Sequence, residues 1–196
     1  PTDPSVTPVG RWLLDETTGL TAAPAAGNAP ATASEGVWWD ESGHEGGSAF
    51  FDGSGEGLAT PGPVLDTSRA YTVAAWVKLD SASTGWAPAL TQDGTLHSAF
   101  YFGYNLDENR WTFGQCPPDG VGSCTANAVS DNPPTRDVWT HIVGVYDPAA
   151  EKIRLYVNGV LQDEQWTEPI IRPATGPLRI GGSKWDGEGG AAEFLY

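Results

Sequence analysis

The sequence contains nine tryptophans, and several of them stand beside charged residues in glycine-rich segments. This pairing suits sugar binding, because a pyranose presents an apolar C–H face to an indole and hydroxyl groups to polar side chains. Trp185, flanked by Lys184 and Asp186, is the leading candidate, and Trp86 and Trp38 lie in loops or at strand ends. These five residues are predicted to bind a ligand. The alternative for each ring is that it packs beneath its own loop or caps the end of the fold.

The other tryptophans differ in their surroundings. Trp39 and Trp166 also fall in loops or at strand ends. Trp12, Trp76 and Trp139 fall in alternating, strand-like patterns, which predicts that these three rings belong to the core.

The two cysteines, Cys116 and Cys124, are separated by seven residues that include two Gly and two Pro. Such a loop can close on itself, so a disulfide is predicted. Metal binding is the alternative, but it would want Cys or His partners nearby, and His97 and His141 lie in separate strand-like runs. A disulfide favours an oxidising setting, so the protein is expected to be secreted.

Charge and length restrict the class of protein. The 196 residues carry 10 Lys+Arg against 25 Asp+Glu, a formal net charge of −15. A surface this acidic repels phosphate, so nucleic acid is not expected as a partner. Apolar runs are far shorter than the ~20 residues of a membrane span, so membrane insertion is not expected either. Residues 1–8, rich in Pro and Thr, are interpreted as a linker and 9–196 as one domain.

Short extended segments must position these residues, because period-two alternation recurs along the chain and no helical stripe occurs. Residues 71–79 place Tyr71, Val73, Ala75, Val77 and Leu79 on one face. Asn158-Gly159 is a hairpin signal, since both central residues of a type I′ turn need positive φ. Residues 21–35, rich in Ala, Pro, Gly and Ser, are interpreted as a long surface loop. Further strands are expected over 9–15, 48–52, 98–104, 110–115, 139–146, 152–157, 160–162 and 178–182. This pattern predicts an all-β, two-sheet antiparallel β-sandwich.

Six segments together resemble the laminin-G-like, concanavalin A-type jelly roll of secreted bacterial multidomain proteins. The resemblance spans almost the whole chain, in the family's order. It implies two stacked antiparallel sheets, and members that bind carbohydrate, bind proteins or space other domains. The segments are Trp12-Leu-Leu-Asp-Glu16, Ala49-Phe-Phe-Asp-Gly53, Tyr71-Thr-Val-Ala-Ala-Trp-Val77, Trp139-Thr-His-Ile-Val143, Leu155-Tyr-Val-Asn-Gly159 and Leu178-Arg-Ile-Gly-Gly182.

The resemblance also implies a structural calcium where the first and last strands meet, with Asp15 and Asp52 as ligands. The alternative is that both are ordinary turn and edge carboxylates. Asp52 opens a segment like the first half of an EF-hand loop, but Pro63 in the twelfth position excludes an EF-hand.

The family's closing strand, of the type Gly-x-Ile-Asp-Glu-Val-Arg-Val-Tyr, is expected after residue 191, where the chain reads Ala192-Glu-Phe-Leu-Tyr196. The terminal strand is therefore expected to be missing. A shortened chain is the favoured explanation, and the alternative is a strand donated by another chain or a neighbouring module.

Enzymes of this sandwich type place two carboxylates on one strand as Glu-x-Asp-x-(x)-Glu, because acid and nucleophile must flank one glycosidic bond. The sequence contains no such motif and no Gly-x-Ser-x-Gly elbow. Asp163-Glu164 reads as a solvated pair, and His44, His97 and His141 have no evident triad partner. The expected function is a non-catalytic, extracellular recognition or adhesion module for carbohydrate or protein. The alternatives are a spacer or assembly domain and, less favoured, a glycoside hydrolase.

Overall fold

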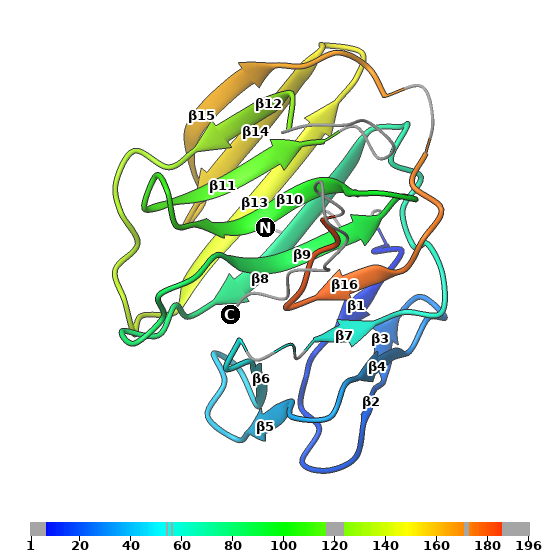
Figure 1. Ribbon diagram of the computed structural model, residues 1–196, viewed down its shortest axis with the longest axis vertical. Coiled ribbons are helices and arrows are strands. Elements are labelled where there is room, and N and C mark those ends of the chain that lie inside the picture. Colours follow the sequence, from blue (N-terminus) through cyan, green and yellow to red (C-terminus); the bar gives the residue numbers. More distant parts are fainter. Residues whose placement is uncertain (1–6, 54, 56, 117–123, 171–172, 186–196) are drawn as a thin grey trace.

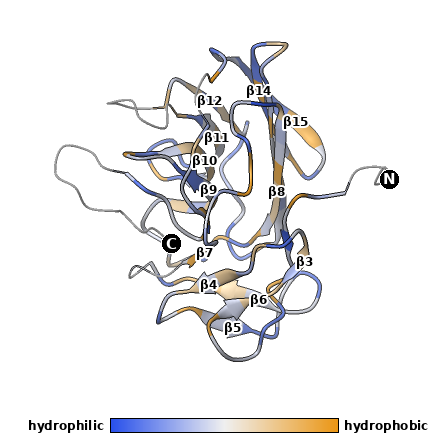
Figure 2. Ribbon diagram, turned by 90° about the vertical axis from the view of Figure 1, so that its right-hand side faces the viewer, coloured by the Kyte–Doolittle hydropathy of each residue, from blue (hydrophilic) through white to orange (hydrophobic). Residues whose placement is uncertain are grey.

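The computed structural model describes residues 7–185, apart from residues 54, 56, 117–123 and 171–172 (Figure 1). In this part of the chain the regular elements are all strands, and every strand pair is antiparallel. Two sheets stack face to face, as the view along their edges shows (Figure 2). The predicted all-β sandwich is confirmed. The same described residues contain no helix long and apolar enough to cross a membrane.

The smaller sheet has the order β15-β14-β13-β8 and the larger sheet the order β12-β11-β10-β9-β16-β7-β4-β2. Two further pairs, β1-β3 and β5-β6, lie near the end of the molecule formed by the N-terminal residues (Figure 1). The smaller sheet consists of β8 (Tyr71–Val77), β13 (Thr140–Asp147), β14 (Lys152–Val157) and β15 (Val160–Trp166). The larger sheet consists of β2 (Thr21–Ala22), β4 (Ala31–Ala33), β7 (Leu58–Ala59), β9 (Ala87–Asp93), β10 (Ser98–Asn105), β11 (Arg110–Gln115), β12 (Ala126–Val129) and β16 (Leu178–Ile180). The pairs are β1 (Arg11–Trp12) with β3 (Pro24–Ala26) and β5 (Trp38–Asp40) with β6 (Ser48–Phe50).

The main core fills the space between the two sheets. Its strands alternate inward apolar with outward polar side chains, as a sandwich requires. The largest buried rings come from both sheets, with Tyr71 of β8 lying 5.4 Å from Phe100 of β10 between ring centroids. Gly144 of β13 lies against the Phe113 ring so closely that an added Cβ would sit 2.6 Å from it. The other fully buried apolar side chains of this core include Phe102, Tyr104, Ile142, Tyr146, Ile153 and Leu155.

A second, smaller core lies beneath the N-terminal strands, and it corrects the interpretation of residues 21–35 as a surface loop. Ala22, Ala31 and Ala33 are buried together with Leu58. These residues build β2, β4 and β7, which extend the larger sheet beyond β16. The sequence suggested a loop because alanine, proline and glycine carry little β propensity. Alanine nevertheless allows strands to pack closely, and burial decides the outcome here.

Strand β9 was also missed in the sequence, because Pro88 lies inside it. Proline cannot donate to a strand ladder and is confined to edges and bulges. In the structure, the register between β9 and β10 shifts between Phe102 and Gly103, next to Pro88, so the proline occupies such an irregularity. The strand therefore accommodates a proline although it pairs with both β10 and β16.

Candidate functional site

Two aromatic pairs lie on the larger sheet, and the first of them joins β9 to β10. Trp86 immediately precedes β9, and its ring meets that of Tyr101 edge-on at 5.3 Å. Tyr101 pairs with Gly114 across the sheet, while the adjacent pair Phe102–Phe113 faces the core. Because side chains alternate along a strand, Tyr101 lies on the outer face. Burial raises the pKa of the Tyr101 phenol well above its usual value, and its hydroxyl donates to the Tyr104 carbonyl at 2.6 Å.

The second aromatic pair joins the segment after β16 to the start of β10. Trp185 forms an isolated antiparallel bridge with His97, and the two rings lie 4.6 Å apart. His97 is 2% exposed, whereas Trp185 is 36% exposed. Lys184 is fixed beside them: its backbone N–H donates to the Ser98 hydroxyl at 2.9 Å, and its ammonium group donates to the Thr95 carbonyl at 2.6 Å. The exposed indole therefore stands on a backbone held in place at several points.

A buried ion pair supports this corner of the sheet. The Asp93 side chain is 3% exposed, and its carboxylate lies 2.6 Å from Arg179 Nε. The other oxygen of Asp93 accepts a hydrogen bond from the Ser98 hydroxyl at 3.1 Å. Because Ser98 also accepts the Lys184 N–H, the pair fixes β9, β16 and the Lys184–Trp185 segment relative to one another.

Among the described residues, the buried polar atoms without a hydrogen-bond partner include one in the His97–Trp185 bridge and one in β11. These two are His97 Nδ1 and Thr112 Oγ1, in residues that are 2% and 1% exposed. Thr112 pairs with Gly103, so it lies on the same outer face as Tyr101. Buried polar atoms are normally paired, so each exception calls for a physical explanation, such as strain or a bound water or ion.

The predicted ligand-binding residues are only partly brought together. Trp185, Lys184 and Trp86 all lie against β9 or β10 of the larger sheet. Trp38 does not join them: it lies on β5, is 70% exposed and pairs with Phe50 of β6 at the far end of the molecule (Figure 1). Asp186 lies outside the described residues.

The prediction that Trp76 belongs to the core is wrong, because its side chain is 46% exposed. It alternates with Ala75 and Val77, which pack against the core, and so it faces outward from β8. There the His44 ring stacks on it with centroids 3.4 Å apart. The His141 ring of β13 lies 5.1 Å away on the neighbouring strand. Sequence reasoning missed this cluster, although the alternation of residues 71–79 already required Trp76 to point away from the core.

The other two predicted core tryptophans are only partly buried. Trp12 packs against the second core, and its Nε1 donates to the Ala29 carbonyl at 3.0 Å. Trp139 is half-buried, with the Lys78 ammonium 5.2 Å from its ring centroid.

Burial lowers the pKa of the His141 imidazole, and the nearby His44 ring lowers it further.

The predicted disulfide between Cys116 and Cys124 is present. It lies at the end of β11, where the Cys116 N–H donates to the Ala99 carbonyl of β10 at 2.9 Å. The disulfide thus ties the connection after β11 to the sheet that carries the two aromatic pairs.

The carboxylates predicted to bind calcium are both exposed. Asp15 accepts a hydrogen bond from the Gly47 N–H at 2.8 Å, which links the segment after β1 to the start of β6. Across the described residues, no three His, Cys, Asp or Glu side chains gather as a metal-binding group. Calcium bound through Asp15 and Asp52 stays a prediction.

Two stacked antiparallel sheets of this order define the jelly-roll class of β-sandwich. Residues 52–194 match the family model of the concanavalin A-like lectin/glucanases superfamily, in its laminin G branch, and the chain belongs to this family. No curated protein matches the sequence.

Solved structures share the fold at low sequence identity. Domain 4 of an extracellular arabinanase from Geobacillus stearothermophilus, in complex with arabinotriose, is 17% identical with a TM-score of 0.58, covering 88% of this chain and 81% of that one. A Trypanosoma rangeli sialidase is 13% identical with a TM-score of 0.60, covering 92% of this chain and 28% of that one. A third structure concerns botulinum neurotoxin type C, whose cell entry depends on interaction with two ganglioside molecules. It is 12% identical with a TM-score of 0.51, covering 91% of this chain and 45% of that one. At these identities the similarity shows the fold alone.

Proposed function

We propose that the domain is a non-catalytic recognition module that binds carbohydrate on the outer face of its larger sheet. The observation that carries this proposal is the Trp185 indole, 36% exposed, resting on the buried His97 ring beside the anchored Lys184. An indole offers its face to the apolar side of a sugar ring, and Lys184 keeps ammonium hydrogens for hydroxyl oxygens. Because the backbone is fixed, little ordering entropy is lost on binding.

The structural relatives support a glycan as the ligand class. The arabinanase domain holds arabinotriose, and the neurotoxin structure is described with gangliosides. Both share this sandwich fold. The Cys116–Cys124 disulfide supports an extracellular location, because disulfides persist in oxidising compartments.

The absence of catalysis is part of the proposal, and the surroundings of Asp93 support it. Asp93 is buried and engaged by Arg179 and Ser98, so it serves as a structural anchor. A glycosidase needs one carboxyl group free to donate a proton and a second to act as nucleophile or base.

Affinity electrophoresis in gels containing linear arabinan, alongside a glycan array, tests the proposed site. Trp185→Ala should weaken binding about tenfold or more, the loss expected for one stacked ring. Leu106→Ala is the control, because Leu106 is 37% exposed and lies in the β10–β11 turn. Equal binding by Trp185→Ala and wild type would reject this site, and arabinan hydrolysis by the wild type would reject a non-catalytic role.

A second candidate function, as an assembly domain completed by another chain or module, is favoured by the edge of the smaller sheet. Among the described strands β8 pairs only with β13, so its other edge is open. A cavity of about 400 Å³ lies along it, lined by side chains of both sheets such as Val73, Leu90 and Ile180 and also by the N-terminal residues 8–14. An extended segment could add there as a further strand.

A further inference from the structure

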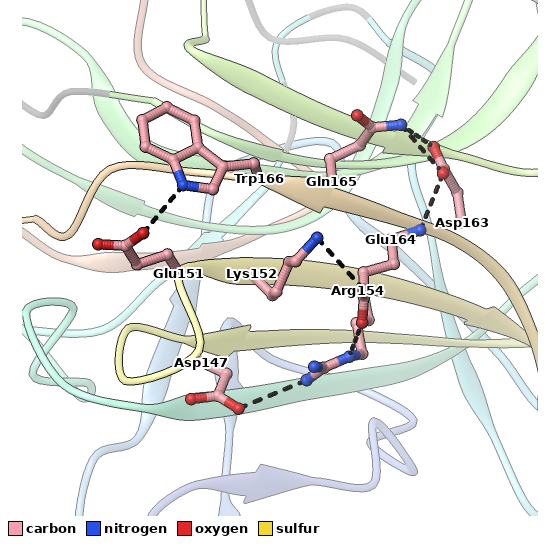
Figure 3. Close-up of polar contacts among 8 residues, drawn as sticks. All are labelled: Asp147, Glu151, Lys152, Arg154, Asp163, Glu164, Gln165 and Trp166. Carbon is pink, nitrogen blue, oxygen red and sulfur yellow. Dashed lines mark hydrogen bonds and ion pairs between the residues drawn. The ribbon is translucent and has the colours of Figure 1, made fainter.

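We propose that the outer face of the smaller sheet holds a second carbohydrate site, centred on Trp166, which takes a neutral saccharide. This site is independent of the proposed function, which concerns the opposite sheet. Its consequence, a module that bridges two sugar chains, rests on both sites. The close-up of Figure 3 shows the residues concerned.

The Trp166 ring is exposed and yet held in one orientation. It ends the edge strand β15 and is 56% exposed. Its Nε1 donates to a Glu151 carboxylate oxygen at 3.0 Å (Figure 3). The Glu151 carbonyl accepts the Thr167 N–H at 3.0 Å. The indole edge is thus occupied by protein, while the apolar ring remains open to solvent. A fixed, exposed ring is the arrangement that stacking on a sugar requires.

Charged side chains of alternating sign lie beside the ring on β14 and β15. Lys152 is the cross-strand partner of Trp166, and its ammonium lies 3.3 Å from Glu164. Arg154 lies 2.6 Å from the other oxygen of Glu164 and 3.5 Å from Asp147 (Figure 3). Hydrogen bonds from Arg154 and Lys152 lower the pKa of the Glu164 carboxyl, so this group is ionised at neutral pH.

These side chains retain capacity for a ligand. Lysine has three donors and arginine five, and the ion pairs with Glu164 and Asp147 use only some of them. The side chains of Lys152, Arg154 and Glu164 are 33%, 23% and 37% exposed, so their remaining donors and acceptors can be reached. Sugar hydroxyls both donate and accept hydrogen bonds, so they can pair with the donors of Lys152 and Arg154 and with the acceptor oxygens of Glu164.

The local charge selects a neutral ligand. Asp147, Glu151 and Glu164 contribute three negative charges and Lys152 and Arg154 two positive ones, leaving −1. A polyanion would be repelled by this local negative charge and by the net charge of −15 of the whole chain. A protein partner would need a contiguous apolar centre, whereas the side chains beside this indole, Glu151 and Lys152, are charged. A neutral saccharide can stack on the Trp166 indole and form hydrogen bonds with the charged side chains beside it.

The strands that carry the two sites belong to opposite layers of the sandwich. β14 and β15 belong to one layer and β9 and β10 to the other, and the edge-on view separates them (Figure 2). A domain with one site on each outer face can hold two chains at once. Bridging therefore follows from the geometry of the fold, with no need for a dimer.

Affinity electrophoresis of the full chain in linear arabinan, galactan and xylan tests the second site. Trp166→Ala should weaken binding about tenfold or more to at least one of these polymers, through loss of the stacked ring. Trp166→Phe should retain most of the affinity, because it keeps an aromatic face and gives up only the bond to Glu151. Leu161→Ala, on the same strand and with Leu161 47% exposed, is the matched control and should bind like the wild type.

The outcomes separate this inference from the proposed function. If Trp166→Ala binds all three polymers like the wild type, or if the wild type binds none of them, the second site is rejected. If Trp185→Ala binds normally while Trp166→Ala does not, the second site stands and the proposed site on the larger sheet fails. Turbidity on mixing wild type with the polymer it binds should appear, and should vanish in either single variant. Turbidity that persists in Trp166→Ala would overturn bridging through this face.

Discussion

The stack of His44 on Trp76 brings two imidazoles to one indole on the outer face of β8 and β13. The His44 and Trp76 ring planes are 11° from parallel, and His141 lies on the adjacent strand. Lys78 is close by, over the Trp139 ring. Burial and the neighbouring His44 both disfavour the protonated form of His141, which lowers its pKa in the folded state.

This lowered pKa predicts a loss of stability in mild acid. The unfolded chain binds a proton at His141 near the ordinary pKa of about 6.5, whereas the folded protein binds it only at lower pH. The free energy of unfolding should therefore decrease as the pH falls from about 7 through 6. Urea unfolding at several pH values measures the slope. His44→Gln should flatten it by removing one cause of the shift, and a slope unchanged in both His44→Gln and His141→Asn would contradict the assignment.

The strands show which features of the fold were accessible from sequence. Residues 152–157 alternate cleanly, and Ile153 and Leu155 are indeed buried. The expected strand over 110–115 matches β11 at both ends. Alternation works where one face of a strand packs on the main core, because only then does burial impose period two. Alternation fails for β2 and β4, because their few alanines do not differ enough in polarity from the residues beside them to show which face is buried. It also fails for β9, where Pro88 lies beside an irregularity in the strand register.

The candidate site was less predictable for a related reason. Composition identified Trp185 and Lys184, since an indole beside charge in a glycine-rich segment is unusual. It did not identify His97 as the ring partner of Trp185 or Tyr101 as the ring partner of Trp86, because these contacts join different segments across the sheet. The sequence placed Trp166 in a loop or at a strand end, but it did not show whether the ring is exposed, since that depends on β15 being an edge strand. Side-chain type can be read locally, whereas neighbours across a sheet depend on topology.

The β14–β15 hairpin offers a test of local backbone chemistry. Its turn residues Asn158 and Gly159 have φ values of 49° and 79°, as a type I′ turn requires. Replacing both by valine should destabilise the protein by about 1–2 kcal/mol for each residue forced into the left-handed region. Urea denaturation measures the loss. Val160→Ala is the control because Val160 is 61% exposed, and equal stabilities of the double variant and this control would reject the turn assignment.

The open edge of β8 leads to a prediction about assembly. An unpaired strand beside an apolar cavity invites pairing with another segment, so a chain lacking a partner should self-associate or capture a strand. Size-exclusion chromatography with light scattering should show concentration-dependent dimers, which Ala74→Pro on this edge should reduce. Ala74 is exposed, and Thr72→Ala is the matched control on the same face. A wild type that is monomeric at every concentration would exclude strand donation between copies.

At the scale of the whole molecule, two cores of unequal strength share one larger sheet. The main core buries Phe100, Phe102, Phe113 and several aliphatic side chains, whereas the buried residues of the second core are three alanines and Leu58, and its larger side chains, such as Trp12 and Phe51, are only partly buried. Stabilisation by burial is about 25 cal/mol per Å² of apolar surface, so the second core contributes much less. Both proposed sugar sites rest on strands of the main core.

This inequality predicts that the N-terminal strands open before the sandwich does. In native-state hydrogen exchange at increasing urea, amides of β2 and β4 should exchange through an opening of lower free energy and smaller surface exposure than amides of β10 and β11. The latter should converge on global unfolding, because they carry the buried rings of the main core. Ala31→Gly should lower the protection of β2 and β4 alone, whereas Leu155→Ala should lower protection everywhere by about 2–5 kcal/mol. A single free energy for all four strands would show that the two cores unfold as one unit. If the order holds, sugar binding should survive the N-terminal opening, since Trp185 and Trp166 are both held by strands that remain folded.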